Sequence, residues 1–368
     1  MKIAIMGGWN TDSGASYHSE MIGRAFIEQG HQLKVFTFYE DSFHGTNITG
    51  ENEDYVTRCI TTSNAKPPRL NPVPFLIEEY DYFIVEDLGM LPKDLLGKIF
   101  HRIRKKAKTI NVVHDGVLAK DPSFYQFDWD AIVSFDSRYM NFLKKAYDKD
   151  KIHMIPYPAH NMQTGDKKAA REKLGLPQDK KIVLTFGPAS QLVAPLIPAI
   201  SSLKNDYPLH ILGITNHAKA LKLFKAFKQS GIARALKLLK VFKQSSIADI
   251  EIRVDAPDIN KLYEYLQAVD VLVVNKPSVG RVVLSSTIFQ CLGSGCPIVA
   301  LASDFTVMFG DAIISFTSTK ELVSGIKSVF DKDKRYEVID KGREKFIKEN
   351  SATAVAGKFI ELFKKLTG

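Results

Sequence analysis

The first 38 residues, MKIAIMGGWNTDSGASYHSEMIGRAFIEQGHQLKVFTF, decide the fold class. Residues 2–6 form a short apolar run that ends in Gly7-Gly8, the pattern of a buried strand that leads into a glycine loop. Residues 16–29 then repeat apolar side chains at helical spacing, and residues 33–38 have the pattern of a second strand. A strand, a helix and another strand make a βαβ unit, which predicts a parallel sheet.

The same alternation of strands and helices continues along the chain. In the first half it predicts strands at 82–85, 109–113, 131–134 and 151–156, and helices at 93–106 and 137–147. In the second half it predicts strands at 182–186, 209–212, 250–254, 271–274, 297–300 and 313–316, and helices at 260–268, 285–292, 320–330, 336–348 and 353–366. The pattern therefore predicts an α/β protein with two Rossmann-like doubly wound domains facing a cleft.

We expect three segments: an N-terminal Rossmann-like domain at 1–160, a second Rossmann-like domain at 161–348 that carries a duplicated helix, and a C-terminal helix at 349–368 that packs back across the hinge. The chain has 368 residues, 45% of them hydrophobic, which suits two domains with full cores. No apolar run is long enough to predict a membrane-spanning helix, and the N-terminus lacks the pattern of a signal peptide.

Charge and cysteine content restrict the function classes further. The net charge of +9 favours anionic partners, but the chain has no zinc-finger spacing or RNA-binding aromatic signature, so we expect no nucleic-acid partner. Its three cysteines, Cys59, Cys291 and Cys296, lack metal-ligand spacing. We expect Cys291 and Cys296, which lie in an apolar run, to be small core residues; we place the protein in the reducing cytoplasm and expect no metal site.

A tandem duplication lies in the second half. Residues 220–234 (ALKLFKAFKQSGIAR) are nearly repeated by residues 235–249 (ALKLLKVFKQSSIAD), with 11 of 15 positions identical. Each copy has lysines on one helical face and leucines and phenylalanines on the other. Two interpretations remain open: a duplication tolerated at the surface, or a basic amphipathic element that docks on an anionic membrane surface or a partner. The second would place the protein at the inner membrane face as a peripheral protein.

Several ordered motifs resemble those of the family-4 glycosyltransferases, which have the GT-B fold. The Gly-Gly loop at 7–16 precedes a helix bearing His18, and Gly30-His31 precedes the second strand. Further along come Val85-Glu86-Asp87, the strand-ending segment VVHDG at 112–116, and LGSGCPIVA at 292–300. The loop at 7–16 matches neither the dinucleotide fingerprint nor the P-loop.

The resemblance implies roles for particular residues. His114 would lie near the transferred sugar, and Asp115, Asp87 or Glu86 would position or deprotonate the acceptor hydroxyl. We therefore predict a catalytic set of His114, Asp115 and Asp87. The predicted acceptor-side set is Gly8, Asn10, Ser13, Gly14, His18 and Glu86.

The donor side departs from the family pattern. The family carries Arg and Lys after the first strand of its second domain, whereas this chain has GPASQLVA at 187–194. The family's two glutamates fall here at Val282 and Gln290, and only Gln290 can still bond a ribose hydroxyl. Nearby cations, hydroxyls and helix amides are the substitutes we expect. The predicted donor-binding set is Gly187, Ser190, Lys276, Arg281, Ser285, Ser286 and Gln290.

The resulting hypothesis is a retaining glycosyltransferase that moves a sugar from a nucleotide-sugar donor to a hydroxyl of a glycan or lipid-linked acceptor, without a cofactor. Two alternatives remain. The missing donor residues fit a degenerate glycosyltransferase-like protein that binds a nucleotide sugar, or a catalytic partner, without turnover. A sugar-nucleotide epimerase of the same fold is the other alternative.

Overall fold

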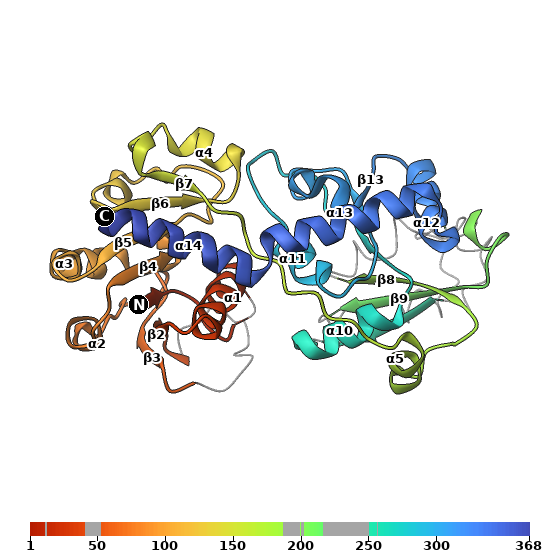
Figure 1. Cartoon of the computed structure of the whole chain (residues 1–368), viewed down its shortest axis with the longest axis horizontal. Coiled ribbons are helices and arrows are strands. Elements are labelled where there is room, and N and C mark those ends of the chain that lie inside the picture. The colour runs from red at the N-terminus through yellow and green to blue at the C-terminus, as the bar shows by residue number, and fades with distance from the viewer. Residues whose placement is uncertain (12, 41–52, 187–198, 200–201, 216–249, 256) are drawn as a thin grey trace. The chain divides into compact units, whose positions relative to one another are not determined.

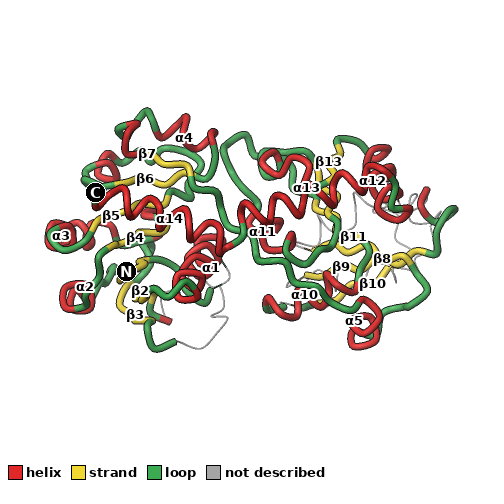
Figure 2. Tube along the Cα trace, in the orientation of Figure 1, coloured by secondary structure: helices red, strands yellow, loops and turns green. Residues whose placement is uncertain are grey.

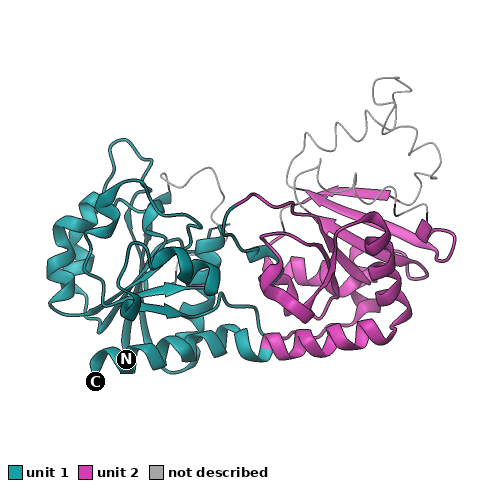
Figure 3. Ribbon diagram, turned by 90° about the horizontal axis from the view of Figure 1, so that it is seen from above, with its two compact units in different colours: residues 1–161, 281–289, 348–368 teal, residues 162–280, 290–347 magenta. Residues whose placement is uncertain are grey.

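The computed structural model describes residues 1–11, 13–40, 53–186, 199, 202–215, 250–255 and 257–368 (Figure 1). The chain forms two compact units. The first contains 1–161, 281–289 and 348–368, and the second contains 162–280 and 290–347 (Figure 3). The first unit thus includes residues 281–289, which the sequence analysis assigned to the second domain.

The first unit is built on a seven-stranded parallel sheet in the order β3-β2-β1-β4-β5-β6-β7. The central strands are buried apolar runs because helices cover both faces of such a sheet. The order reverses between β1 and β4, which makes their carboxyl ends the topological switch point of this unit. The strands are β1 (Lys2–Met6), β2 (Gln32–Phe38), β3 (Val56–Ile60), β4 (Tyr82–Glu86), β5 (Lys108–Val112), β6 (Ala131–Ser134) and β7 (Ile152–Met154).

Helices pack against this sheet (Figure 2). They are α1 (Gly14–Glu28), α2 (Pro72–Ile77), α3 (Lys93–Arg104), α4 (Ser137–Leu143) and the C-terminal α14 (Ala352–Thr367), with short 3₁₀ helices at Leu88–Met90, Pro122–Tyr125 and Lys149–Lys151. Helix α14 packs against α1. Its Phe363 stacks on Tyr82 of β4 with ring centroids 4.2 Å apart, so the C-terminal helix belongs to the core of this unit.

The second unit is built on a six-stranded parallel sheet in the order β10-β9-β8-β11-β12-β13. Its core joins buried side chains of the strands and of α12 with Ile339 of α13. The strands are β8 (Lys181–Phe186), β9 (Leu209–Thr215), β10 (Ile250–Val254), β11 (Val271–Val274), β12 (Ile298–Leu301) and β13 (Ile314–Phe316). Helices α5 (Lys167–Leu174), α10 (Ile259–Ala268) and α12 (Thr319–Asp331) and a 3₁₀ segment at Val307–Ala312 lie wholly in this unit. Helices α11 (Ser286–Leu292) and α13 (Lys334–Asn350) are each divided between the two units.

The α/β fold with two doubly wound parallel sheets is confirmed. The sequence analysis missed two elements, β3 and α2, and it extended the helix after β6 to residue 147 where α4 ends at Leu143. The duplicated segment 220–249 and the loop with Gly187 and Ser190 lie outside the described residues. Among the described residues, no helix combines the length and hydrophobicity needed to cross a bilayer.

Candidate functional site

The candidate site lies at the switch point of the first unit, where β1 and β4 end side by side. Gly7 follows β1, and Glu86 is the last residue of β4. A Cβ atom at position 7 would lie 2.7 Å from Cβ of Glu86, closer than such atoms approach, so glycine is required there. The glycine loop therefore serves first to bring its backbone against a buried carboxylate.

Glu86 is the centre of a buried hydrogen-bonded triad with two histidines. His18 on α1 donates from Nδ1 to Oε1 of Glu86 over 3.0 Å. His114, two residues past β5, donates from Nε2 to the other oxygen, Oε2, over 2.7 Å. His18 and Glu86 are 0% and 1% exposed. Both carboxylate oxygens are thus occupied, and each histidine ring has a fixed tautomer or charge state.

The environment separates the charge states of the two histidines. Burial lowers the pKa of His18 and outweighs the opposing effect of Glu86, which favours a neutral ring. Burial alone would raise the pKa of Glu86, but the charges and hydrogen bonds of the histidines lower it. Burial also opposes protonation of His114, yet its bond to Glu86 and the nearby carboxylates raise its pKa. The triad therefore favours a neutral His18 and an ion pair between Glu86 and His114.

Two further carboxylates converge next to the triad. Asp87 follows β4 in a left-handed conformation, with φ 58°, and Asp115 follows His114. A Cβ atom at Gly89 would lie 2.9 Å from Oδ2 of Asp115 and 3.3 Å from Oδ1 of Asp87. Burial raises the pKa of Asp87 to about 6, with the charge of Asp115 adding to the effect and that of His114 opposing it. A carboxyl group with this pKa can gain or lose a proton near neutral pH.

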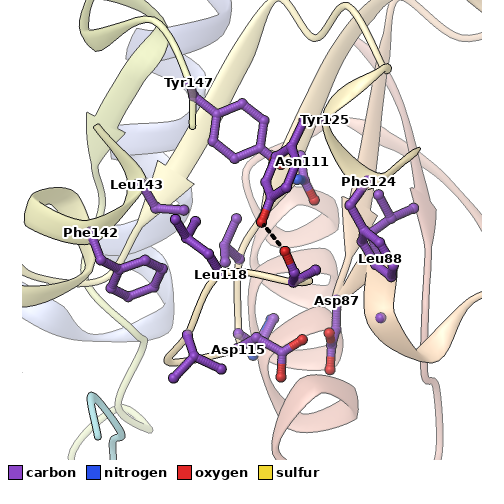
Figure 4. Close-up of a pocket in the computed structure, with 15 residues that line it drawn as sticks. Asp87, Leu88, Asn111, Asp115, Leu118, Phe124, Tyr125, Phe142, Leu143 and Tyr147 are labelled. Atoms are coloured by element: carbon purple, nitrogen blue, oxygen red, sulfur yellow. Dashed lines mark hydrogen bonds between the residues drawn. The ribbon is translucent and has the colours of Figure 1, made fainter. Parts of the chain in front are cut away.

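These groups open into a small pocket with an aromatic roof (Figure 4). The hydroxyl of Tyr125 donates to the carbonyl of Ala119 over 2.9 Å, which holds one wall in place. In Figure 4 the carboxylates of Asp87 and Asp115 lie at one end of the pocket and the rings of Tyr125 and Tyr147 at the other, with Phe124 and Phe142 at its sides. The lining residues are Asp87, Leu88, Gly89, Asn111, Val113, His114, Asp115, Val117, Leu118, Ala119, Phe124, Tyr125, Phe142, Leu143 and Tyr147.

The segment 281–289 docks beside this pocket. A Cβ atom at Gly116 would overlap the carbonyl oxygen of Val282, so the two backbones are in direct contact. Arg138 donates to the carbonyl oxygen of Val283 over 3.0 Å. The hydroxyl of Ser286 lies 3.4 Å from the position of a Cβ atom at Gly14. The predicted donor residues Arg281, Ser285 and Ser286 thus sit on the same unit as the predicted catalytic residues.

Two predicted acceptor-loop residues have structural roles. Asn10 donates to Glu53 from its side chain over 3.1 Å and accepts from Arg24 over 2.9 Å, so its amide is held within the loop. Ser13 caps α1 by accepting from the backbone N–H of Ser16. These bonds maintain the loop that carries Gly8 and Gly14, and Tyr157 donates to the carbonyl of Gly14 over 2.7 Å.

The other predicted donor residues belong to the second unit. Lys276 follows β11, lies 5.7 Å from the ring centre of Phe305, and has a pKa lowered by burial. Gln290 on α11 is 7% exposed, and its backbone carbonyl accepts from Tyr263 over 2.8 Å. The structure places these two residues in a different unit from Arg281.

The triad also has the composition of a metal site. One ligand atom from each of His18, Glu86 and His114 lies within 4.8 Å of the others, whereas the sequence analysis expects no metal. The same nitrogen and oxygen atoms already bond to each other, so an ion would have to replace two hydrogen bonds. This chemistry fits a carboxylate that orients two histidines at least as well as it fits a ligand set.

The sequence analysis named three polar residues that line the pocket, Asp87, His114 and Asp115, but it did not name Asn111, the aromatic lining residues or Arg138. Phe142, Tyr125 and Tyr147 line the pocket, and Arg138 holds the segment 281–289. No local signal marks these residues, because aromatic side chains in this pattern also fill ordinary cores. Asn111 was the one accessible clue, since it is a polar side chain inside the apolar strand β5 and is only 2% exposed.

No protein-family model matches the chain, but solved structures match it from end to end. Sucrose-phosphate synthase from Thermosynechococcus elongatus is 16% identical, with TM-score 0.64 over 100% of this chain and 99% of that chain. HepE of Anabaena, in complex with UDP-glucose, is 12% identical, with TM-score 0.65 over 99% and 100%. A glycosyltransferase from Rickettsia africae ESF-5 is 14% identical, with TM-score 0.61 over 100% and 98%. These likenesses establish the fold as that of the GT-B glycosyltransferases.

Proposed function

We propose that this protein transfers a sugar from a nucleoside-diphosphate sugar to a hydroxyl acceptor, with retention of configuration, as its resemblance to family-4 glycosyltransferases implies. The observation that carries the proposal is the His114 imidazole, which Glu86 fixes at the carboxyl edge of the first sheet beside Asp87 and Asp115. The likeness to HepE, which was solved with UDP-glucose, supports the choice of donor class.

The hydrogen bonds and burial of each residue suggest its role in the proposed reaction. Glu86 has both oxygens bonded to histidines, so it is a positioning residue rather than a base. His114 lines the pocket and has its Nε2 committed to Glu86, which leaves Nδ1 to bond a sugar hydroxyl. Asp87 is the group whose pKa, about 6, suits it to position or deprotonate an acceptor hydroxyl. Asp115 lies near Asp87, on the other side of Gly89, and its charge helps to raise the pKa of Asp87.

The leaving group needs positive charge, since a nucleoside diphosphate departs as an anion. We assign this role to Arg281, which lies on the segment docked beside the pocket, with Lys276 and the hydroxyls of Ser285 and Ser286 as further contributors. Replacement of Arg281 by alanine should weaken UDP binding by about 1.5–3 kcal/mol, the value of a charge-assisted hydrogen bond. Isothermal titration calorimetry measures the change, with Arg102→Ala, which removes an exposed arginine of helix α3, as the matched control.

Turnover is tested by incubating the protein with a panel of nucleotide sugars and detecting the released nucleoside diphosphate. Release that disappears in His114→Ala supports transfer. One alternative is kept because the resemblance to family-4 glycosyltransferases implies a carboxylate at the position of Val282, which cannot supply one. Tight binding of a nucleotide sugar without any release would therefore favour a binding protein over an enzyme.

A further inference from the structure

The second unit contains a cavity of about 280 Å³ that the proposed transfer reaction does not use. It opens at the amino edge of the six-stranded sheet, because Lys181 begins β8, Asp270 precedes β11 and Pro297 precedes β12. The carboxyl edge, where ligands of doubly wound sheets normally bind, is the opposite edge. Any ligand of this cavity is therefore distinct from a nucleotide sugar bound at the carboxyl edge.

Cationic side chains dominate the cavity wall. Lys167, Lys181 and Lys332 line it, together with one carboxylate, that of Asp270. The Asp270 carboxylate accepts hydrogen bonds from Lys167 over 2.9 Å and from Arg171 over 2.8 Å. Burial alone would raise the pKa of Asp270, but its hydrogen bonds and the nearby cations lower it. The one acidic side chain of the wall is thus neutralised, and the remaining charge is positive.

Lys181 and Lys332 are held where they can meet a ligand. The ammonium of Lys181 donates to the carbonyl of Phe330 over 3.3 Å and lies 5.5 Å from the centre of its ring. An ammonium group has three N–H donors, so this bond leaves capacity for further acceptors. Lys332 ends α12 in a left-handed conformation, with φ 50°, which carries its side chain out of the helix at the cavity.

The strongest indication comes from Arg343 on α13. Its side chain is 6% exposed, and Nη2 bonds to Asp340, but Nε and Nη1 have no hydrogen-bond partner in the part of the chain that the structure describes. A buried N–H without an acceptor costs roughly 1–3 kcal/mol, and more in a charged group. A native protein tolerates such a cost where water or a ligand supplies the acceptor.

Arg343 adjoins the cavity through two lining residues. Tyr336 lines the cavity and lies seven residues before Arg343, on the same face of α13. Helical side chains lean toward the N-terminus of their helix, which brings the guanidinium back toward Tyr336. The charge of Arg343 acts on both Tyr336 and Cys296, and both of these residues line the cavity.

We propose that this cavity binds the phosphate group of a small anionic metabolite, with Arg343, Lys181 and Lys332 as its cationic contacts. The open N–H donors of Arg343 and the ammonium groups of the lysines can each bond a phosphate oxygen, and their charges favour an anion. The volume approaches the lower end of small-molecule sites, about 300 Å³, and so exceeds what a lone ion requires. The proposal does not depend on the sugar-transfer function, since it concerns the other edge of the sheet.

The test is a calorimetric titration of the full-length protein with a hexose phosphate and, separately, with inorganic phosphate. Saturating UDP is present throughout, so that the proposed transfer site is already occupied. Three variants are compared. Lys332→Gly removes one cation at a left-handed position that glycine adopts without strain, and Arg343→Met removes the buried cation while keeping an apolar chain. Lys341→Ala, an exposed lysine of α13 that does not line the cavity, is the control.

We expect the hexose phosphate to bind the wild type and Lys341→Ala equally. Lys332→Gly and Arg343→Met should each weaken it by about tenfold or more, as expected for loss of a charge-assisted contact. Inorganic phosphate that binds as tightly as the hexose phosphate would identify free phosphate as the ligand, with the same residues. Failure of both anions to bind the folded wild type, or equal affinities in all variants, would overturn the proposal and leave water as the partner of Arg343. Because Lys332→Gly does not alter a buried residue, it decides the matter even if Arg343→Met does not fold.

Discussion

The buried charges of the two units are satisfied in opposite ways. In the first unit, Glu86 accepts hydrogen bonds from both His18 and His114, so both oxygens of the buried carboxylate are paired, and Nε2 of His18 is the atom of the triad that has no partner among the described residues. In the second unit, Arg343 is equally buried but leaves Nε and Nη1 without an acceptor among the described residues. Since an unpaired buried polar group is costly, the first arrangement is preorganised for chemistry and the second is suited to receiving an anion.

Removal of the Glu86 carboxylate, at the centre of the triad with His18 and His114, should have the largest effect on stability. Glu86→Ala leaves two buried imidazoles without their acceptor, and we expect the free energy of unfolding to fall by about 3–5 kcal/mol, the cost of breaking a buried ion pair. Urea denaturation monitored by circular dichroism measures the change. Glu28→Ala on the exposed face of α1 is the control and should change stability by less than about 0.5 kcal/mol. Similar stabilities for the two variants would show that the triad is not a stabilising unit.

The next test concerns the contact between Gly116 and the segment 281–289, both of which belong to the first unit. Gly116→Ala should destabilise the protein by about 1–3 kcal/mol, because its Cβ atom would overlap the carbonyl of Val282. Gly97→Ala is the matched control, since its Cβ atom would have only Phe127 near it, at 3.8 Å, and alanine favours helix α3. Hydrogen exchange of residues 281–289 should rise in Gly116→Ala and stay unchanged in Gly97→Ala. Unchanged hydrogen exchange in both variants would show that the contact with Gly116 does not hold the segment 281–289 beside the pocket.

Asp87 should show a conflict between stability and function. Its folded pKa of about 6 lies above the ordinary 3.8, so folding becomes less favourable as pH rises from about 4 to 6 and the buried group ionises. Asp87→Asn removes this penalty and suits the left-handed conformation. We expect it to be more stable than wild type by about 1–3 kcal/mol at pH 7, with little difference at pH 4.

The functional side of that prediction is a loss of transfer in Asp87→Asn, and a wild-type rate that declines as pH falls below about 6. Thermal unfolding across this pH range and rates of nucleotide release measure the two effects. Full activity of Asp87→Asn would show that the Asp87 carboxyl group takes no part in the reaction. A variant less stable than wild type at pH 7 would contradict the raised pKa of Asp87.

The smallest expected effect concerns the duplicated segment. Deletion of 235–249 leaves one copy, and we expect it to reduce sedimentation with anionic liposomes at low salt, with each lysine contributing about 1 kcal/mol near a charged surface. High salt and neutral liposomes are the controls, because both remove the electrostatic attraction. Equal sedimentation of wild type and deletion would favour the alternative, a duplication tolerated at the surface.

The sequence alone determined the order of strands and helices, because hydrophobic periodicity is a local property that one buried strand or one amphipathic helix already displays. Residues 2–38 therefore predicted β1, α1 and β2 almost to the residue. Strand β3 was missed because its residues, VTRCI, include an arginine and lie at the edge of the sheet, where burial and hence the apolar signal are weaker.

Only the tertiary structure decided which polar residues act together. His18, Glu86 and His114 come from three elements far apart in the sequence, and their pairing depends on strand order and on the close approach at Gly7. The hydrogen bonding of Arg343 also depends on the tertiary structure, because the helical periodicity of α13 does not indicate that Nε and Nη1 lack partners among the described residues. Periodicity reports which face of an element is buried, but the partner of a buried charge is set by contacts between elements, which sequence spacing does not encode.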